Sequence, residues 1–332
     1  FGLTSEDINS TSYAQIINNA KEEYLEKILE LKKILKSKSS AWKASPFLSR
    51  THGQAASPST FGKEINVFLR RLDNEIKTLK SIKVKGKWGG ATGNFHTLVL
   101  VDEKKNWINF IKGFFKFIKT PLNTLTTQIE PHDCIAELSH SIVRINNVLI
   151  DINRDVWMYI SNDLFKLKVI KGEVGSSTMP HKVNPIDFEN SEGNLELSNA
   201  LFTFFGDKLS KSRLQRDLSD STVLRNIGVP FGHSYLAIQS LIKGFSKLEV
   251  NKEQSLKELN NNWQILGEAI QTVMKLEGYD DAYEIIKDLT RGELLTENSY
   301  KSLINSLNIS IKSKSKLLKL TPAKYIGLSK SI

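Results

Sequence analysis

The polar segment at residues 172–185 gathers several side chains that could do chemistry. It contains two glycines, which permit the backbone mobility of a lid, and two prolines, which fix local dihedral angles. Its reactive side chains are Ser176, Ser177, Lys182 and Asn184. Because Lys182 and Asn184 are two residues apart in an irregular segment, the ammonium and the amide can both reach one carboxylate. A lone serine in such a loop is usually a turn residue, and a lone lysine usually faces solvent. It is the combination of these residues in one segment that indicates a candidate catalytic site.

Two shorter polar segments offer further candidates. His52 lies in residues 49–54, which read Ser-Arg-Thr-His-Gly-Gln, and an imidazole can deliver a proton near neutral pH. In residues 4–7, which read Thr-Ser-Glu-Asp, the hydroxyls of Thr4 and Ser5 can bind a carboxylate or a phosphate, or Ser5 can simply cap the next helix. The six histidines show no i, i+4 metal-ligand spacing with a carboxylate, so we expect no metal ion and no cofactor.

A third group of side chains could bind a phosphate. Arg216, Ser221 and Arg225 are spaced by five and four residues, so the last two share a face if this segment is helical. Two guanidiniums and a hydroxyl make a phosphate clamp. The alternative is a surface salt bridge with Asp217 or Asp220.

Length and composition exclude several classes of protein. At about 150 residues per domain, 332 residues predict two domains with ample length for a large core. Apolar runs stay well short of the roughly 20 residues that a membrane-spanning helix needs, so we expect no membrane partner. The single cysteine excludes an internal disulfide and is typical of a reducing compartment. We therefore expect a cytoplasmic protein.

The positive charge is the main departure from an average composition. The formal net charge is +10, and only nine of the 46 basic residues are arginine. Nucleic-acid-binding proteins usually add arginine clusters or aromatic stacking platforms to such an excess, so we expect no nucleic-acid partner. A positive field can still steer a small polyanionic substrate into a cleft. The rival hypothesis is a helical scaffold without catalytic activity, or a nucleic-acid-binding protein that uses this charge.

The elements that position these side chains are predicted to be helices. Apolar residues recur at spacings of three and four over residues 17–35 and 61–79, and through most of 133–170. Further helices are expected from about residue 186 and over 222–246, where Pro230 should kink the helix or end its first segment. Strand signals are limited to residues 99–101 and 82–84. The chain is therefore predicted to be all-α, with long helices that pack in a bundle.

The helical segments become shorter after about residue 246. Expected segments lie near residues 256–273, 281–290 and 296–307, and a last turn starts at Thr321-Pro322. This change predicts two domains. Residues 1–245 would form a central long-helix bundle with the candidate catalytic segments, and residues 246–332 a smaller C-terminal helical domain.

Several of these segments resemble the fumarase/aspartase superfamily. Its signature loop, GSSxMPxKxNP, resembles residues 175–185, which read GSSTMPHKVNP. Residues 4–7 and 49–54 are similar to two further shared blocks and stand in the same order. Within the superfamily, the bacterial-type branch of the adenylosuccinate lyases resembles residues 126–133, TTQIEPHD, and 213–226, RLQRDLSDSTVLRN. The resemblance covers essentially the whole chain.

The resemblance implies a β-elimination. Fumarate would leave from adenylosuccinate to give AMP, and from the succinyl-aminoimidazole intermediate SAICAR to give AICAR, in purine nucleotide biosynthesis. Such a reaction needs a base for a weakly acidic C–H group, donors for the resulting aci-carboxylate and an acid for the leaving nitrogen. The alternative within the same fold is a sister lyase of the argininosuccinate lyase or fumarase type.

The same resemblance assigns roles to individual residues. Ser176 is the expected base, with Ser177 as the second candidate, and His52 is the expected acid. Lys182 and Asn184 would bind the fumarate-forming carboxylate.

The resemblance also implies residues that hold the rest of the substrate. Gln128 would bind the succinyl portion or the nucleobase of the substrate. Glu189 is a possible relay that orients a histidine or accepts a proton. The alternative for Glu189 is a structural role, because a carboxylate at a helix start suits the helix dipole. The remaining expected substrate-binding residues are Thr4, Ser5, Thr51, Arg216, Ser221 and Arg225.

The family's assembly gives one further expectation. Four subunits of the superfamily pack their bundles into one helical core, and each active site draws its blocks from three chains. We therefore expect a homotetramer in which His52 and Ser176 of one site come from different subunits. Adenylosuccinate lyases also begin with a further small helical domain that nothing here matches. We expect the sequence to continue before Phe1, and the alternative is that the protein has lost this domain.

Overall fold

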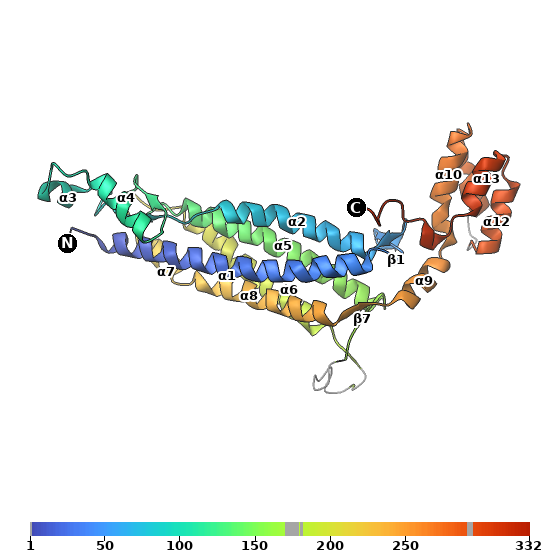
Figure 1. Cartoon of the computed structure of the whole chain (residues 1–332), viewed down its shortest axis with the longest axis horizontal. Helices are drawn as coiled ribbons and strands as arrows, with labels where there is room; N and C mark the ends of the chain where they lie inside the picture. The colour runs from blue at the N-terminus through green and yellow to red at the C-terminus, as the bar shows by residue number, and fades with distance from the viewer. Residues whose placement is uncertain (1, 170–178, 180–181, 291–294) are drawn as a thin grey trace. The chain divides into compact units, whose positions relative to one another are not determined.

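The computed structural model describes residues 2–169, 179, 182–290 and 295–332 (Figure 1). Helices dominate the described chain, and its strands are two or three residues long, which confirms the all-α prediction. The chain divides into two compact units. Unit 1 comprises residues 1–34, 70–157 and 184–246, and unit 2 comprises residues 35–69, 158–183 and 247–332.

The described helices of 20 residues or more all lie before residue 248, where shorter ones lie among them. The helices up to residue 247 are α1 Ser5–Trp42, α2 Phe61–Ser81, α3 His96–Val101, α4 Trp107–Phe117, α5 Asp133–Ser161, α6 Ile186–Lys208, α7 Ser219–Leu224 and α8 Gly228–Lys247. Those that follow are α9 Lys252–Asn260, α10 Gly267–Leu276, α11 Ala282–Thr290, α12 Glu297–Ser306 and α13 Ile311–Leu318, with 3₁₀ turns at Trp263–Leu266 and Pro322–Lys324.

The strands form four two-stranded pairs among the described residues. Three pairs are antiparallel: β1 Pro46–Phe47 with β4 Ser59–Thr60, β2 Arg50–Thr51 with β3 Gln54–Ala55, and β7 Phe165–Leu167 with β8 Leu248–Val250. The fourth pair is parallel and joins β5 Gly86–Lys87 to β6 Leu122–Asn123. Pairs this short fix the ends of loops and form no core of their own.

The core of unit 1 is a bundle with a polar network inside it. The hydroxyl of Tyr24 in α1 donates to Oδ1 of Asn146 in α5 at 3.0 Å. The Asn146 amide donates in turn to Ser234 Oγ in α8 at 2.9 Å, and Ser234 shares a 2.7 Å hydrogen bond with Ser198 in α6. Burial raises the pKa of Tyr24 far above its ordinary value, so the hydroxyl stays a donor. The network fixes the four helices that run side by side in Figure 1.

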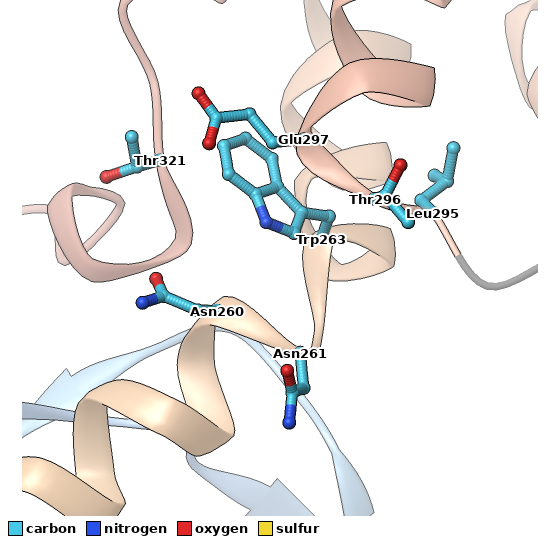
Figure 2. A pocket seen from close by; sticks show the side chains of 7 residues that line it. All are labelled: Asn260, Asn261, Trp263, Leu295, Thr296, Glu297 and Thr321. Atoms are coloured by element: carbon cyan, nitrogen blue, oxygen red, sulfur yellow. The ribbon is translucent and has the colours of Figure 1, made fainter.

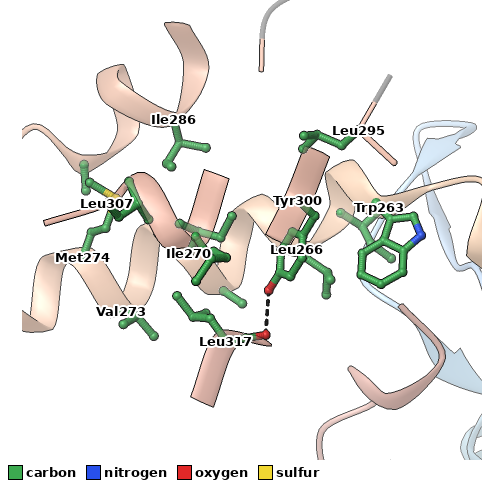
Figure 3. Packing of buried hydrophobic residues seen from close by; sticks show 14 of the residues in the cluster. Trp263, Leu266, Ile270, Val273, Met274, Ile286, Leu295, Tyr300, Leu307 and Leu317 are labelled. Atoms are coloured by element: carbon green, nitrogen blue, oxygen red, sulfur yellow. Dashed lines mark hydrogen bonds between the residues drawn. The ribbon is translucent and has the colours of Figure 1, made fainter. Parts of the chain in front are cut away.

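Unit 2 has an apolar cluster of its own in its C-terminal helices. Residues of α10, α11, α12 and α13 pack around buried Ile270 and Leu266, as Figure 3 shows. The hydroxyl of Tyr300 donates to the carbonyl of Leu317 at 3.0 Å, so the one polar atom of this ring has a partner inside the cluster.

Two local strand predictions were wrong. Residues 99–101 form the end of α3, where Leu98 is buried with Ile111 and Phe115, and tertiary packing overrides the β-branched sequence. Residues 82–84 lie outside the strands, and the short strand comes at Gly86–Lys87 instead. The helix expected through most of 133–170 is confirmed as α5, which ends at Ser161 before the chain turns at Asp163 with a φ of 58°.

The helix expected over 222–246 is two helices. Chain turns separate α7 from α8, and Pro230 lies in the first turn of α8, where a missing N–H is tolerated. The expected helix is thus interrupted, but the break lies at residues 225–227, before Pro230, so the expectation that the proline itself kinks the helix or ends its first segment is not confirmed. The two-domain division near residue 245 stays a prediction.

Candidate active site

A buried ion pair fixes the start of α1 in unit 1. The Asp7 carboxylate lies 2.6 Å from Nζ of Lys87, and the two side chains are 1% and 0% exposed. The carboxylate also accepts the backbone N–H groups of Thr4 at 2.9 Å, Gly89 at 2.9 Å and Gly90 at 3.2 Å. A pair this deeply buried is tolerable because its remaining hydrogen-bonding capacity is satisfied.

Lys87 joins this pair to the segment that contains Gln128. Its ammonium donates to the carbonyl of Gly90 at 3.1 Å and to the carbonyl of Gln128 at 2.8 Å. With Asp7, these acceptors use all three of its N–H donors. Sequence reasoning missed Lys87 because lysines fill the surface of this chain. The available signal was its place in the glycine-rich segment 86–93 rather than on a helix face.

Arg216 is held between two side chains of unit 1. Its guanidinium lies 2.9 Å from Oε1 of Glu6 and donates to Oε1 of Gln128 at 3.3 Å. The Arg216 side chain is 15% exposed and that of Glu6 is 7% exposed. The third guanidinium nitrogen, Nε, is buried and has no hydrogen-bond partner within the described chain. The structure thus brings together three predicted segments, those of Thr4, Gln128 and Arg216.

Gly93 allows the glycine-rich segment to contact residues 126–128. Its φ is 77°, and a Cβ atom built on it would lie 1.9 Å from the carbonyl oxygen of Thr126. Only glycine fits a position that combines this dihedral angle with this close approach.

The other two members of the expected clamp lie on and after α7. Ser221 is half-buried in this six-residue helix, and Arg225 is exposed directly after it. Arg216 pairs with Glu6, so the alternative of a salt bridge to Asp217 or Asp220 is wrong for this arginine. Hydrogen bonds from Ser219 lower the pKa of Asp217 to about 2.

His52 lies at the tip of a hairpin in unit 2. Thr51 ends β2 and Gln54 begins β3, so His52 and Gly53 form the two-residue connection. Both have positive φ values, 54° and 75°, as a type I′ turn requires. Arg50 at the base of the hairpin forms an ion pair with Glu258 of α9. The imidazole of His52 and the side chain of Thr51 are exposed.

The signature segment is described in part. Ser176, the expected base, and Ser177 lie outside the described residues. Lys182 is exposed and Asn184 is half-buried, so their predicted grip on one carboxylate stays a prediction. Glu189, in the first turn of α6, accepts the indole N–H of Trp157 at 2.9 Å. Its predicted relay role also stays a prediction.

The most spacious of the described pockets lies elsewhere, in unit 2. It measures 660 Å³ and contains none of the expected site residues (Figure 2). Its lining consists of Asn260, Asn261, Trp263, Leu295, Thr296, Glu297 and Thr321. Over the ranges that the structure covers, we find no His, Cys, Asp and Glu group fit for a metal ion and no helix long and apolar enough to cross a membrane.

Comparisons with known proteins give the family. A family model described as "Lyase" matches residues 1–197, and one described as "Adenylosuccinate lyase C-terminal" matches residues 212–326. The adenylosuccinate lyase of Haemophilus influenzae is 48% identical over 330 residues, which cover 98% of this chain and 72% of that protein. The adenylosuccinate lyase of Escherichia coli is 47% identical over 331 residues, with the same coverage.

Solved structures share the fold. The fumarate lyase of Mesorhizobium sp. BNC1 has a TM-score of 0.81 at 16% identity, and the 3-carboxy-cis,cis-muconate lactonizing enzyme of Pseudomonas putida has 0.80 at 19%. Each similarity covers 99% of this chain and 75% of the other chain. The helical bundle and the matched models define a lyase of the fumarase/aspartase superfamily. Within that class, the chain belongs to the adenylosuccinate lyase family.

Proposed function

We propose that this chain cleaves adenylosuccinate to AMP and fumarate, and SAICAR to AICAR and fumarate. The observation that supports this most strongly is the near 48% identity to curated adenylosuccinate lyases along almost the entire chain. The chain is therefore a carbon–nitrogen lyase of purine nucleotide biosynthesis. The named relatives do not favour a sister lyase that acts on another substrate.

The proposed chemistry is a β-elimination with separate base and acid. Ser176 removes a proton from the succinyl carbon adjacent to the carbon that bears the leaving nitrogen. The electron pair of the broken C–H bond forms the new double bond of fumarate. The C–N bond breaks as His52 donates a proton to the leaving nitrogen. Lys182 and Asn184 hold the carboxylate that gathers negative charge during the proton transfer.

The remaining site residues would bind the rest of the substrate. The buried, unpartnered Nε of Arg216 supports a role in binding a phosphate, together with Ser221 and Arg225. Thr4 and Ser5 would bind a carboxylate or the phosphate of the substrate, and Gln128 would bind the succinyl portion or the nucleobase. Thr51 would be a further substrate-binding residue, and Glu189 would act as the relay.

We also propose that the active enzyme is a cytoplasmic homotetramer with active sites shared between subunits. Apolar side chains are exposed on the long helices of the single chain, as a surface that packs against other subunits requires. Examples are Ile16, Leu197, Phe204 and Leu236. A single buried, unpaired cysteine, Cys134, is compatible with the reducing cytoplasm.

An ultraviolet assay of adenylosuccinate cleavage tests the function and the base together. We expect the parent protein to form AMP and fumarate, and Ser176→Ala to lose activity by at least about 10²-fold. A parent that ignores adenylosuccinate but cleaves a sister lyase substrate would overturn the function. Activity that survives in the variant would overturn the assignment of the base and point to Ser177.

A further inference from the structure

Two adjacent acids at the start of α1 have different partners. Asp7 is paired with Lys87 and backbone N–H groups, so its charge is already compensated. Glu6 has no part in the chemistry proposed above, yet it is almost as deeply buried and faces Arg216. A buried carboxylate next to an expected substrate-binding guanidinium needs its own explanation.

We propose that Glu6 is a positioning residue that orients Arg216 for the phosphate of the substrate. This inference rests on the proposed function. Glu6 does not touch the reacting atoms, and it acts through the contact between its carboxylate and the Arg216 guanidinium.

The contacts of Arg216 fix its guanidinium and leave some of its N–H donors unused. A guanidinium is a planar, rigid fork, so fixing two of its nitrogens fixes the third. Glu6 binds one terminal nitrogen and Gln128 the other. The Gln128 amide is itself oriented, because its Nε2 donates to the carbonyl of Ala91 at 3.2 Å and so leaves its Oε1 toward Arg216. Each terminal nitrogen keeps a second N–H, and the buried Nε–H has no partner among the described residues, so Arg216 retains donors for a phosphate oxygen.

The Glu6 carboxylate is held in place by its own helix. The Asn9 amide donates to Glu6 Oε1 at 3.1 Å, and the Ser10 hydroxyl donates to Oε2 at 3.4 Å. These residues lie three and four positions later in α1, on the same face. A carboxylate with a fixed position can aim a long side chain, and it spares the substrate the cost of ordering that side chain on binding.

Two conservative variants separate contact from charge. Glu6→Gln keeps the length and an acceptor oxygen but removes the charge, whereas Glu6→Asp keeps the charge but shortens the reach by one methylene. We expect Glu6→Asp to raise KM for adenylosuccinate about 10-fold or more, as for a lost hydrogen bond to a charged group, with a much smaller change in kcat. We expect Glu6→Gln to stay within about threefold of the parent, because the geometry survives.

The phosphate gives a second readout that a purely structural role would not move. Succinyladenosine, which lacks the phosphate, should show the same kcat/KM with Glu6→Asp as with the parent. The matched control is Glu75→Asp, because Glu75 pairs with Arg144 on the surface of the same unit, and this variant should match the parent on both substrates.

Other outcomes would overturn the proposal in distinct ways. If Glu6→Gln raises KM for adenylosuccinate and Glu6→Asp does not, the charge of Glu6 matters and the geometry of its contact does not. If KM falls in either variant, Glu6 competes with the phosphate for Arg216. Equal losses with and without the phosphate would mean a general structural role. A parent without activity on adenylosuccinate would instead overturn the proposed function.

Discussion

At the scale of single residues, the buried pair of Asp7 and Lys87 makes a prediction about stability. Replacing Lys87 with Met leaves the Asp7 carboxylate buried without its cation, although three backbone N–H groups remain. We expect the free energy of unfolding to fall by about 3 kcal/mol, at the lower end for a broken buried pair. Urea unfolding at fixed protein concentration measures it. Lys211→Met, which breaks the exposed pair with Asp207, is the control and should change little.

The thiol of Cys134 gives a prediction about pH. Burial, followed by the nearby Glu130 carboxylate, raises the pKa of Cys134 to about 11. At pH 8 only about one thiol in a thousand is then a thiolate, the reactive form. We expect alkylation by iodoacetamide to be slow in the native protein and to speed up about tenfold per pH unit from pH 8 to 10. A rate that levels off near pH 9 would show an ordinary thiol, and unfolded protein gives the reference rate.

Sequence reasoning found some residues of the site and missed others for identifiable reasons. Gln128 and Arg216 stand in segments with a family pattern, and the structure places them in contact. Lys87 and Glu6 were missed because a lysine or a glutamate is usually exposed. Their burial depends on the packing of distant segments, which spacing along one chain does not encode.

At the scale of elements, the hairpin at residues 50–55 determines how His52 can be tested. Its φ of 54° is in the left-handed region, which asparagine adopts more readily than most residues. His52→Asn should therefore keep the turn and the melting temperature while it removes the proton donor. We expect kcat to fall by about 10²-fold to 10⁴-fold. A kcat near that of the parent, with an intact fold, would remove His52 from the role of acid.

The glycine-rich segment offers a matched pair of variants. Gly90 and Gly93 have nearly equal φ values, 76° and 77°, but a Cβ on Gly90 meets no atom within 4 Å, whereas one on Gly93 meets the Thr126 carbonyl. Gly90→Ala should cost the left-handed strain alone, about 1–2 kcal/mol. Gly93→Ala should destabilise more and also raise KM, because it displaces the segment that contains Gln128. Equal losses in urea unfolding would contradict the importance of this close approach.

The elements that could be predicted from the sequence are the long helices, in which apolar residues recur many times at helical spacing. The apolar stripe of α5 repeats over 29 residues, so its helical character is evident from the sequence. The strands are too short for an alternating pattern, so β5 at Gly86–Lys87 gave no signal. The break between α7 and α8 lies before Pro230, so the proline, which suits either a kink or a first turn, indicated an interruption but not its position.

At the scale of the whole molecule, active sites shared between subunits predict that two inactive variants regain activity when they are mixed. His52→Asn removes the acid and Ser176→Ala removes the base, so each homotetramer should be inactive. If the two residues of one site come from different subunits, mixed tetramers contain some sites with both residues intact. We therefore expect activity to return when the two variants are mixed under conditions that allow subunits to exchange.

The controls for this mixing experiment decide what it means. Exchange is demonstrated by native mass spectrometry of subunits with distinct masses, and the tetramer by light scattering. A double variant with both changes in one chain, mixed with itself, must stay inactive. Proven exchange without any return of activity would place His52 and Ser176 of each site on the same chain. The exposed apolar side chains of the long helices would then support subunit packing alone, without shared active sites.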